Sequence, residues 1–205
     1  MKRVQKRLQK NQRTPHPLTL CSLVLLGMPS LVWAFPADQD WVPVQRSAQS
    51  TVDVETDSTD GLNLVGDFTG PAFYVYKDSA EFAVRIRLDA DPTVNGVLDS
   101  FSWGILIDDD FDAGDYEIAL LANGSSNQLE LYENTSGTGL GDPTDISETL
   151  IYSEALEYPS NSSAPNIRIT QADTNLNFAA DYFLDISIET SEMSSLGLEG
   201  IPLRL

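Results

Sequence analysis

The sequence predicts an all-β protein, an antiparallel and jelly-roll-like β-sandwich with little helix. Short apolar runs alternate with polar residues along most of the chain, and turns rich in Gly, Asn, Asp and Pro separate them. No stretch keeps a helical period for three turns. Many short strands joined by polar turns are typical of two packed sheets.

Residues 1–34 predict a signal peptide that is cleaved after Ala34. Six basic residues and no acidic residue lie in the first 17 positions, before an apolar run over 18–28, and Val32-Trp33-Ala34 is an A-x-A-like cleavage site. The apolar run is shorter than the roughly 20 residues that span a bilayer. We therefore expect a secreted protein, periplasmic or extracellular, with no membrane insertion after signal removal; a membrane anchor is the alternative.

Removal of the leader also removes the only cysteine, Cys21, and the only histidine, His16. The mature chain then offers no disulfide, no thiolate ligand and no histidine base, so its stability must come from a hydrophobic core. It keeps 6 basic residues against 31 acidic ones, a net charge of −25. Such a charge excludes ordinary binding to the phosphate backbone of nucleic acids.

The mature chain divides into two parts. Residues 35–60 predict a flexible N-terminal segment with one short strand near Trp41, and residues 61–205 predict the sandwich domain. The strands expected in that domain cover 73–76, 82–88, 101–107, 116–122, 128–133, 150–153, 166–170 and 181–188.

The strands expected at 73–76 and 82–88 flank a polar turn and predict a hairpin. The second of them alternates strictly, so Arg85 and Arg87 are expected on its solvent-facing side, where carboxylates of neighbouring strands could meet them. Asn123-Gly124 predicts positive φ in the turn of a second hairpin. A helical turn is expected over 191–196.

The C-terminal residues 201–205 resemble the start of another strand. A natural end and a truncated domain both remain open.

A run of acidic residues after the strand at 101–107 is the strongest candidate site. Calcium prefers six to eight oxygen ligands, and alternating aspartates are typical of calcium loops. The predicted ligands are Asp108, Asp110, Asp112, Asp115 and Glu117, joined by Asp89 and Asp91 if the strand at 82–88 lies beside that at 101–107. The alternative is a solvated acidic turn paired with Arg85 or Arg87, and Asp89 and Asp91 as turn caps before Pro92.

Aromatic residues suggest a second, weaker site. Tyr74 and Tyr76 share one face of their strand and could form a small sugar-binding platform, whereas Trp103 is in phase with Ile105 and Ile107 and is expected in the core. A glycosidase would need two carboxyl groups at a set separation. No pair of acids in the sequence stands out for that role, so we expect no catalytic residues and no enzyme.

Two motifs together resemble a known group of domains. The first is FAVRIRLDADP from Phe82, and the second is WGILIDDD from Trp103, followed by Tyr116-Glu117. This pattern resembles a group of uncharacterised secreted bacterial β-sandwich domains and, more distantly, the DOMON-like and family-nine-type carbohydrate-binding modules. The resemblance implies a sandwich over about 63–205 and no defined activity, because such folds host many functions.

Together these observations predict a secreted, non-enzymatic β-sandwich module for surface or extracellular interaction, with Ca²⁺ as a stabilising ion. Polysaccharide and cell-surface components are the expected partners. A carbohydrate-binding module is the alternative function, and a glycoside hydrolase that uses carboxylates alone is the third.

Overall fold

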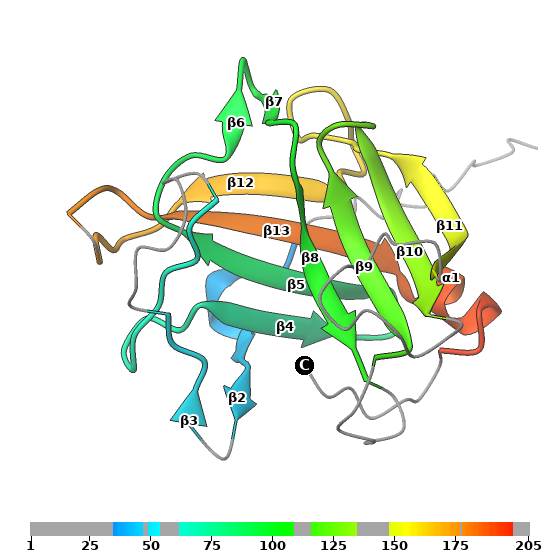
Figure 1. Cartoon of the computed structure of the whole chain (residues 1–205), viewed down its shortest axis with the longest axis horizontal. Coiled ribbons are helices and arrows are strands. Elements are labelled where there is room, and N and C mark those ends of the chain that lie inside the picture. Colours follow the sequence, from blue (N-terminus) through cyan, green and yellow to red (C-terminus); the bar gives the residue numbers. More distant parts are fainter. Residues whose placement is uncertain are drawn as a thin grey trace, which may run out of the picture. The chain divides into compact units, whose positions relative to one another are not determined.

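The computed structural model describes residues 35–46, 49–53, 62–108, 116–134, 148–176 and 178–198. It confirms an all-β, antiparallel sandwich with little helix. Two sheets face each other, and their strands cross at a steep angle (Figure 1). The calcium-loop residues Asp110, Asp112 and Asp115 and the C-terminal residues 201–205 lie outside the described residues.

The first sheet has five strands in the order β1-β4-β5-β13-β12. Their bounds are β1 Val42–Pro43, β4 Phe73–Lys77, β5 Glu81–Leu88, β13 Tyr182–Glu189 and β12 Ile167–Gln171. The second sheet has the order β11-β10-β9-β8, and each of its strands pairs with its neighbour in sequence. Its strands are β8 Ser102–Ile107, β9 Ile118–Asn123, β10 Gln128–Asn134 and β11 Glu148–Ala155.

Smaller elements complete the described part of the chain. Two short ribbons pair β2 (Gln45–Arg46) with β3 (Gln49–Ser50), and β6 (Thr93–Val94) with β7 (Val97–Leu98). A 3₁₀ turn, η1, covers Asp38–Asp40, and the expected helical turn is the short helix α1, Thr190–Ser195. None of the described helices is long and apolar enough to cross a membrane.

The core lies between the two sheets, where alternate residues of each strand point inward. It contains Phe82, Val84, Ile86 and Leu88 of β5, Leu184, Ile186 and Ile188 of β13, and Trp103, Ile105 and Ile107 of β8. Trp103 is buried, as its phase with the two isoleucines predicts. Gly104 allows β8 to approach β9, because a Cβ at this position would overlap the carbonyl oxygen of Leu120.

Both expected hairpins are present. In the β4–β5 turn, the Asp78 carboxylate accepts hydrogen bonds from the backbone N–H of Ala80 and Glu81, which holds the turn and lowers the pKa of Asp78. In the β9–β10 turn, the positive φ expected at Asn123-Gly124 is wrong, because Asn127 adopts it instead. Gly124 is required for close packing, since its Cβ would overlap the carbonyl oxygen of Asp99.

The solvent-facing position expected for Arg85 and Arg87 is also wrong. All residues of β5 are buried, including both arginines on the side away from the core. The alternation did predict which residues share a face, but the N-terminal residues cover that second face. The covering residues Phe35 and Trp41 pack with Ala83, Tyr74 and Tyr76.

Candidate functional site

The candidate site is the outer face of the five-stranded sheet, where charged side chains lie beneath the N-terminal segment 35–41. We call this segment the N-terminal cover. Trp41 lies over the guanidinium of Arg85 with 4.5 Å between the ring centroid and Cζ, and Phe35 lies over Arg168 at 4.7 Å. Part of the region expected to be flexible thus packs on the sheet.

Under the cover, an ion-pair ladder crosses three strands. Arg85 of β5 stands opposite Asp185 of β13, and Asp185 stands opposite Arg168 of β12. Residues directly opposite on neighbouring strands place their side chains close together on one face. The strand register therefore builds the arginine ladder Arg85–Asp185–Arg168.

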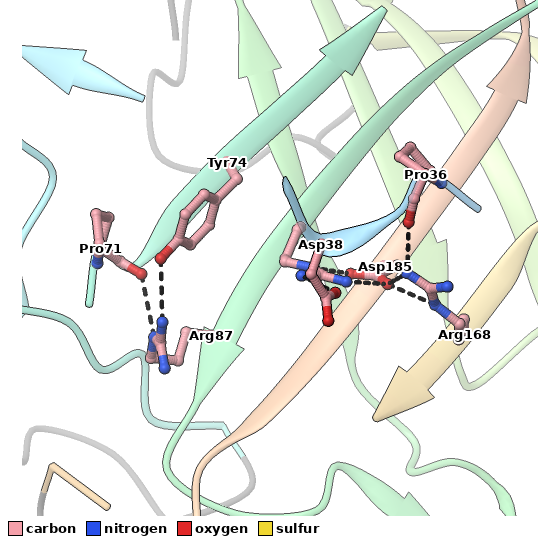
Figure 2. A network of polar contacts seen from close by, with 8 residues as sticks. Pro36, Asp38, Pro71, Tyr74, Arg87, Arg168 and Asp185 are labelled. Atoms are coloured by element: carbon pink, nitrogen blue, oxygen red, sulfur yellow. Dashed lines mark hydrogen bonds and ion pairs between the residues drawn. The ribbon is translucent and has the colours of Figure 1, made fainter. Parts of the chain in front are cut away.

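Asp185 accepts contacts from both arginines and is fully buried. Its oxygens lie 2.7 Å from Nε and 3.1 Å from Nη2 of Arg85, and 2.7 Å from Nε and 2.6 Å from Nη2 of Arg168. Figure 2 shows Asp185 in contact with Arg168, which also donates a hydrogen bond to the backbone oxygen of Pro36 in the cover at 3.5 Å. Arg85 contacts both oxygens of Asp185, whereas Arg168 contacts Oδ2 through two nitrogens. The bidentate Arg85–Asp185 pair fixes the relative geometry of the two planar groups.

Asp38 of the cover adds an exposed carboxylate to the ladder. Its Oδ1 accepts a hydrogen bond from Nη1 of Arg85 at 3.1 Å, although 89% of its side chain is exposed. Burial acts to lower the pKa of Arg85, but the bonds with Asp185 and Asp38 outweigh burial and raise it. Arg85 therefore stays charged while buried.

Arg87 forms a second buried cluster on the same face. Its guanidinium lies over the Phe183 ring at 4.5 Å and donates hydrogen bonds to Tyr74 Oη and Pro71 O, each at 3.1 Å (Figure 2). It also contacts Thr174 Oγ1, and its Nη1 lies 3.8 Å from the fully buried carboxylate of Asp181. Most donors of Arg87 are thus engaged inside the protein.

A hollow of about 220 Å³ opens beside the ladder at the β12 edge of the sheet. Its lining includes Arg168, Thr170, Gln171, Asp173 and Phe183, together with Asp38 and Arg85. Thr170, Gln171 and Asp173 are exposed, and no side-chain hydrogen bond engages them in the described part of the chain. The hollow therefore presents a hydroxyl, an amide and a carboxylate next to a fixed guanidinium; we call it the ladder hollow.

The predicted metal ligands do not come together among the described residues. Asp89 follows β5 and Asp108 follows β8. Asp89 and Asp91 are expected to join the acidic loop only if these two strands are neighbours, but the strands belong to different sheets. The Asp91 carboxylate caps a turn by accepting the Thr93 N–H at 2.9 Å. Across the described ranges, no three acidic, His or Cys residues form a group able to hold a metal.

Asp108 is buried and Glu117 is half-buried at the two ends of the acidic loop. The residues between them lie outside the described part of the chain, so the calcium site stays a prediction. The alternative pairing of the loop with Arg85 or Arg87 likewise stays a prediction. Among the described residues, Arg85 pairs with Asp38 and Asp185, and Arg87 pairs with Asp181.

Tyr74 and Tyr76 are half-buried on one face of β4, as predicted, but both are engaged in packing. Tyr74 meets Phe183 edge-on and accepts the bond from Arg87, and Tyr76 meets Trp41 edge-on and donates a hydrogen bond to Asp78 at 2.9 Å. They support the cover and the arginines. Whether they also contact a sugar remains a prediction.

Sequence reasoning missed Arg168, Phe183 and Asp185 as members of the site. A signal was present, because β5 alternates Arg85 and Arg87 while the strand at 181–188 alternates Phe183 and Asp185. If two such strands are neighbours, opposite charges on the same face of each indicate cross-strand pairing. That β5 and β13 are neighbours could not be read from positions about 100 residues apart in the sequence.

No family model, curated protein or solved structure matches this chain. The relationship to uncharacterised secreted sandwich domains thus stays a prediction from the two motifs.

Proposed function

We propose that the protein is a secreted, non-enzymatic β-sandwich module that binds an extracellular or cell-surface component through the ladder hollow. One observation supports this proposal: among the described residues on the outer face of the five-stranded sheet, the ladder side chains are bonded within the protein, but the exposed side chains at the edge are not. The buried charges of the ladder are saturated by one another, whereas the side chains at its open edge are not engaged. The ladder fixes the position of Arg168, and the edge groups remain available to a ligand.

The same contrast argues for binding over hydrolysis. A carboxylate-only hydrolase needs two acids that face each other across the substrate. The buried acid at this site, Asp185, instead holds two guanidinium groups at 3.1 Å or less. Its role is therefore to position Arg85 and Arg168.

The test is retention of the purified mature protein on isolated cell-envelope and extracellular-matrix fractions, measured by sedimentation. We expect retention that falls in the double variant Gln171→Ala, Asp173→Asn, because these exposed side chains line the hollow and carry no structural bond. Ser160→Ala, an exposed change in another loop, is the matched control. Absence of retention on every fraction would overturn the proposal.

Carbohydrate binding is the second candidate, and the composition of the ladder hollow favours it. Its lining combines donors from Arg168 and Gln171 with acceptors from Asp173 and Asp38, together with the apolar ring of Phe183. Sugars carry neighbouring hydroxyl groups that both donate and accept. The volume is below the roughly 300 Å³ at which pockets for drug-sized ligands begin, which suits one sugar-sized unit.

A polysaccharide array tests this candidate. We expect selective retention on one neutral glycan class that is lost in the Gln171→Ala, Asp173→Asn variant and kept in Ser160→Ala. An array without signal, combined with retention on a protein fraction, would exclude carbohydrate and leave the broader proposal standing.

Calcium is proposed as a stabilising ion at the acidic loop after Ile107. The support is the density of aspartates at a strand end in a strongly acidic chain. Millimolar calcium should raise the melting temperature, EDTA should reverse the rise, and Asp110→Asn should reduce it. If calcium raised the melting temperature of Asp110→Asn as much as that of the parent protein, the ion would bind elsewhere.

A further inference from the structure

We infer that a second hollow, at the base of the β6–β7 hairpin, binds an organic cation, namely an ammonium group on an aliphatic chain. A lysine side chain of a partner or a free alkylamine would supply this chemistry. The inference goes beyond the proposed function, because it concerns a surface separate from the ladder hollow.

The hairpin projects from the body of the sandwich beside the start of β8 (Figure 1). Asn95 and Gly96 form its tip with φ of 56° and 83°, values that a tight two-residue hairpin turn requires. Its base is fixed because Asp99 N–H donates to Pro92 O at 3.0 Å and Leu98 N–H donates to Tyr158 Oη at 3.1 Å. The surface is therefore ordered before any partner binds.

The hollow at this base has a volume of about 190 Å³. Two carboxylates, Asp91 and Asp99, line it together with Phe101, Trp103 and Val94, and no basic side chain is among its described lining residues. One oxygen of each carboxylate accepts a backbone N–H, from Thr93 at 2.9 Å and from Ser100 at 2.6 Å. The second oxygen of each remains available for a cation.

Aromatic rings complete the hollow. Phe101 is 45% exposed and meets Trp103 edge-on with 6.2 Å between ring centroids. An ammonium group gains from the face of an exposed aromatic ring in addition to its attraction to carboxylates. The net charge of the chain, −19 with its leader, further raises the local concentration of cations.

The lining favours an organic over an inorganic cation. Calcium takes six to eight oxygen ligands, but much of this wall is hydrocarbon. An aliphatic ammonium can place its charge at the carboxylates and its methylene groups against Phe101 and Val94. Val94 and Val97 are also about half exposed, so a partner chain would find apolar surface next to the hollow.

The test uses N-acetyl-lysine methylamide as the probe and N-acetyl-norleucine methylamide as its neutral counterpart, with backbone NMR shifts of Thr93, Val94 and Phe101 as the readout. We expect saturable shifts at these positions with the lysine probe alone. Asp99→Asn keeps the acceptor for Ser100 and should weaken binding about two- to fivefold. Phe101→Leu should weaken it by a similar factor, and Glu133→Gln, which removes an exposed acid of β10 outside both hollows, should not.

Three outcomes would overturn the inference. Equal binding of the norleucine probe would mean an apolar hollow without charge recognition. Shifts spread over the surface and unchanged in Asp99→Asn would mean non-specific attraction to an acidic protein. Displacement of the lysine probe by equimolar calcium would mean an inorganic site. Butylamine binding as tightly as the lysine probe would support the ammonium site and assign it to free amines.

The same variant separates this inference from the proposed function. If Asp99→Asn abolishes binding of the lysine probe but leaves retention on envelope fractions intact, the cation site stands and is not the envelope contact. If the lysine probe fails to bind and retention persists, the cation site alone is excluded.

Discussion

Removal of the central carboxylate of the arginine ladder should strongly destabilise the protein. In Asp185→Asn the side chain keeps its size but loses its charge, and its NH₂ group faces arginine donors where an oxygen accepted hydrogen bonds. Four contacts of 2.6–3.1 Å from Arg85 and Arg168 converge on Asp185, which is fully buried. Loss of one partner of a buried ion pair costs about 3–5 kcal/mol, because the remaining charge stays buried and uncompensated.

Asp38, the other carboxylate bonded to Arg85, cannot replace Asp185. Asp38 contacts Arg85 through one hydrogen bond and is 89% exposed, so solvent screens its charge. Asp38→Asn should therefore cost no more than about 1 kcal/mol. Since domains of this kind are stable by roughly 5–15 kcal/mol, the two variants should differ clearly in their unfolding curves.

Urea denaturation followed by tryptophan fluorescence measures both free energies of unfolding. Asp185→Asn should lower the midpoint strongly with little change in slope, and Asp38→Asn should leave it almost unchanged. Replacing all three ladder residues by apolar ones, in Arg85→Met, Asp185→Leu, Arg168→Met, should recover most of the loss. A cost below about 1 kcal/mol for Asp185→Asn would refute the view that the ladder depends on this carboxylate.

Three further variants test the N-terminal cover, the close approach of β8 to β9, and the buried carboxyl group of Glu81. Trp41→Ala should lower the free energy of unfolding by about 3–5 kcal/mol in urea, because it opens the cover over Arg85; a loss below 1 kcal/mol would mean that the cover does not contribute. Gly104→Ala should cost about 3 kcal/mol or more, because its Cβ overlaps the Leu120 carbonyl; an unchanged melting temperature would contradict the close β8–β9 approach. Burial raises the pKa of Glu81, so its contribution to stability is present below the unfolded pKa of about 4.3 and is lost as pH rises through the folded pKa. Glu81→Gln should thus be more stable than the parent at pH 7 and equal to it at pH 4 by thermal unfolding; a pH-independent difference would argue against burial as the cause.

Local sequence patterns predicted the strands well because their causes are local. The alternation over 82–88 fixes which residues share a face, and the polar turn before it supplies the Asp78 cap that closes the hairpin. The phase of Trp103 with Ile105 and Ile107 likewise placed the ring in the core. Each of these predictions depends on residues within a few positions of one another.

The candidate site was less predictable because its parts come from distant segments. The ladder needs β5 beside β13, a pairing about 100 residues apart in sequence, and the cover brings Phe35 and Trp41 onto the same face. The hollow at the hairpin base likewise joins Asp91 and Asp99 to Phe101 only when β6–β7 folds against the start of β8.

The sequence by itself determined the antiparallel sandwich, its hairpins and which residues share a strand face, because strand periodicity and turn chemistry are short-range. Only the tertiary structure decided that Arg85 and Arg87 are buried, since a strand pattern cannot tell whether water or another segment covers its second face. It also decided the partner of Arg85. Charge complementarity acts at a few ångströms, and only the fold brings Asp185 to that distance.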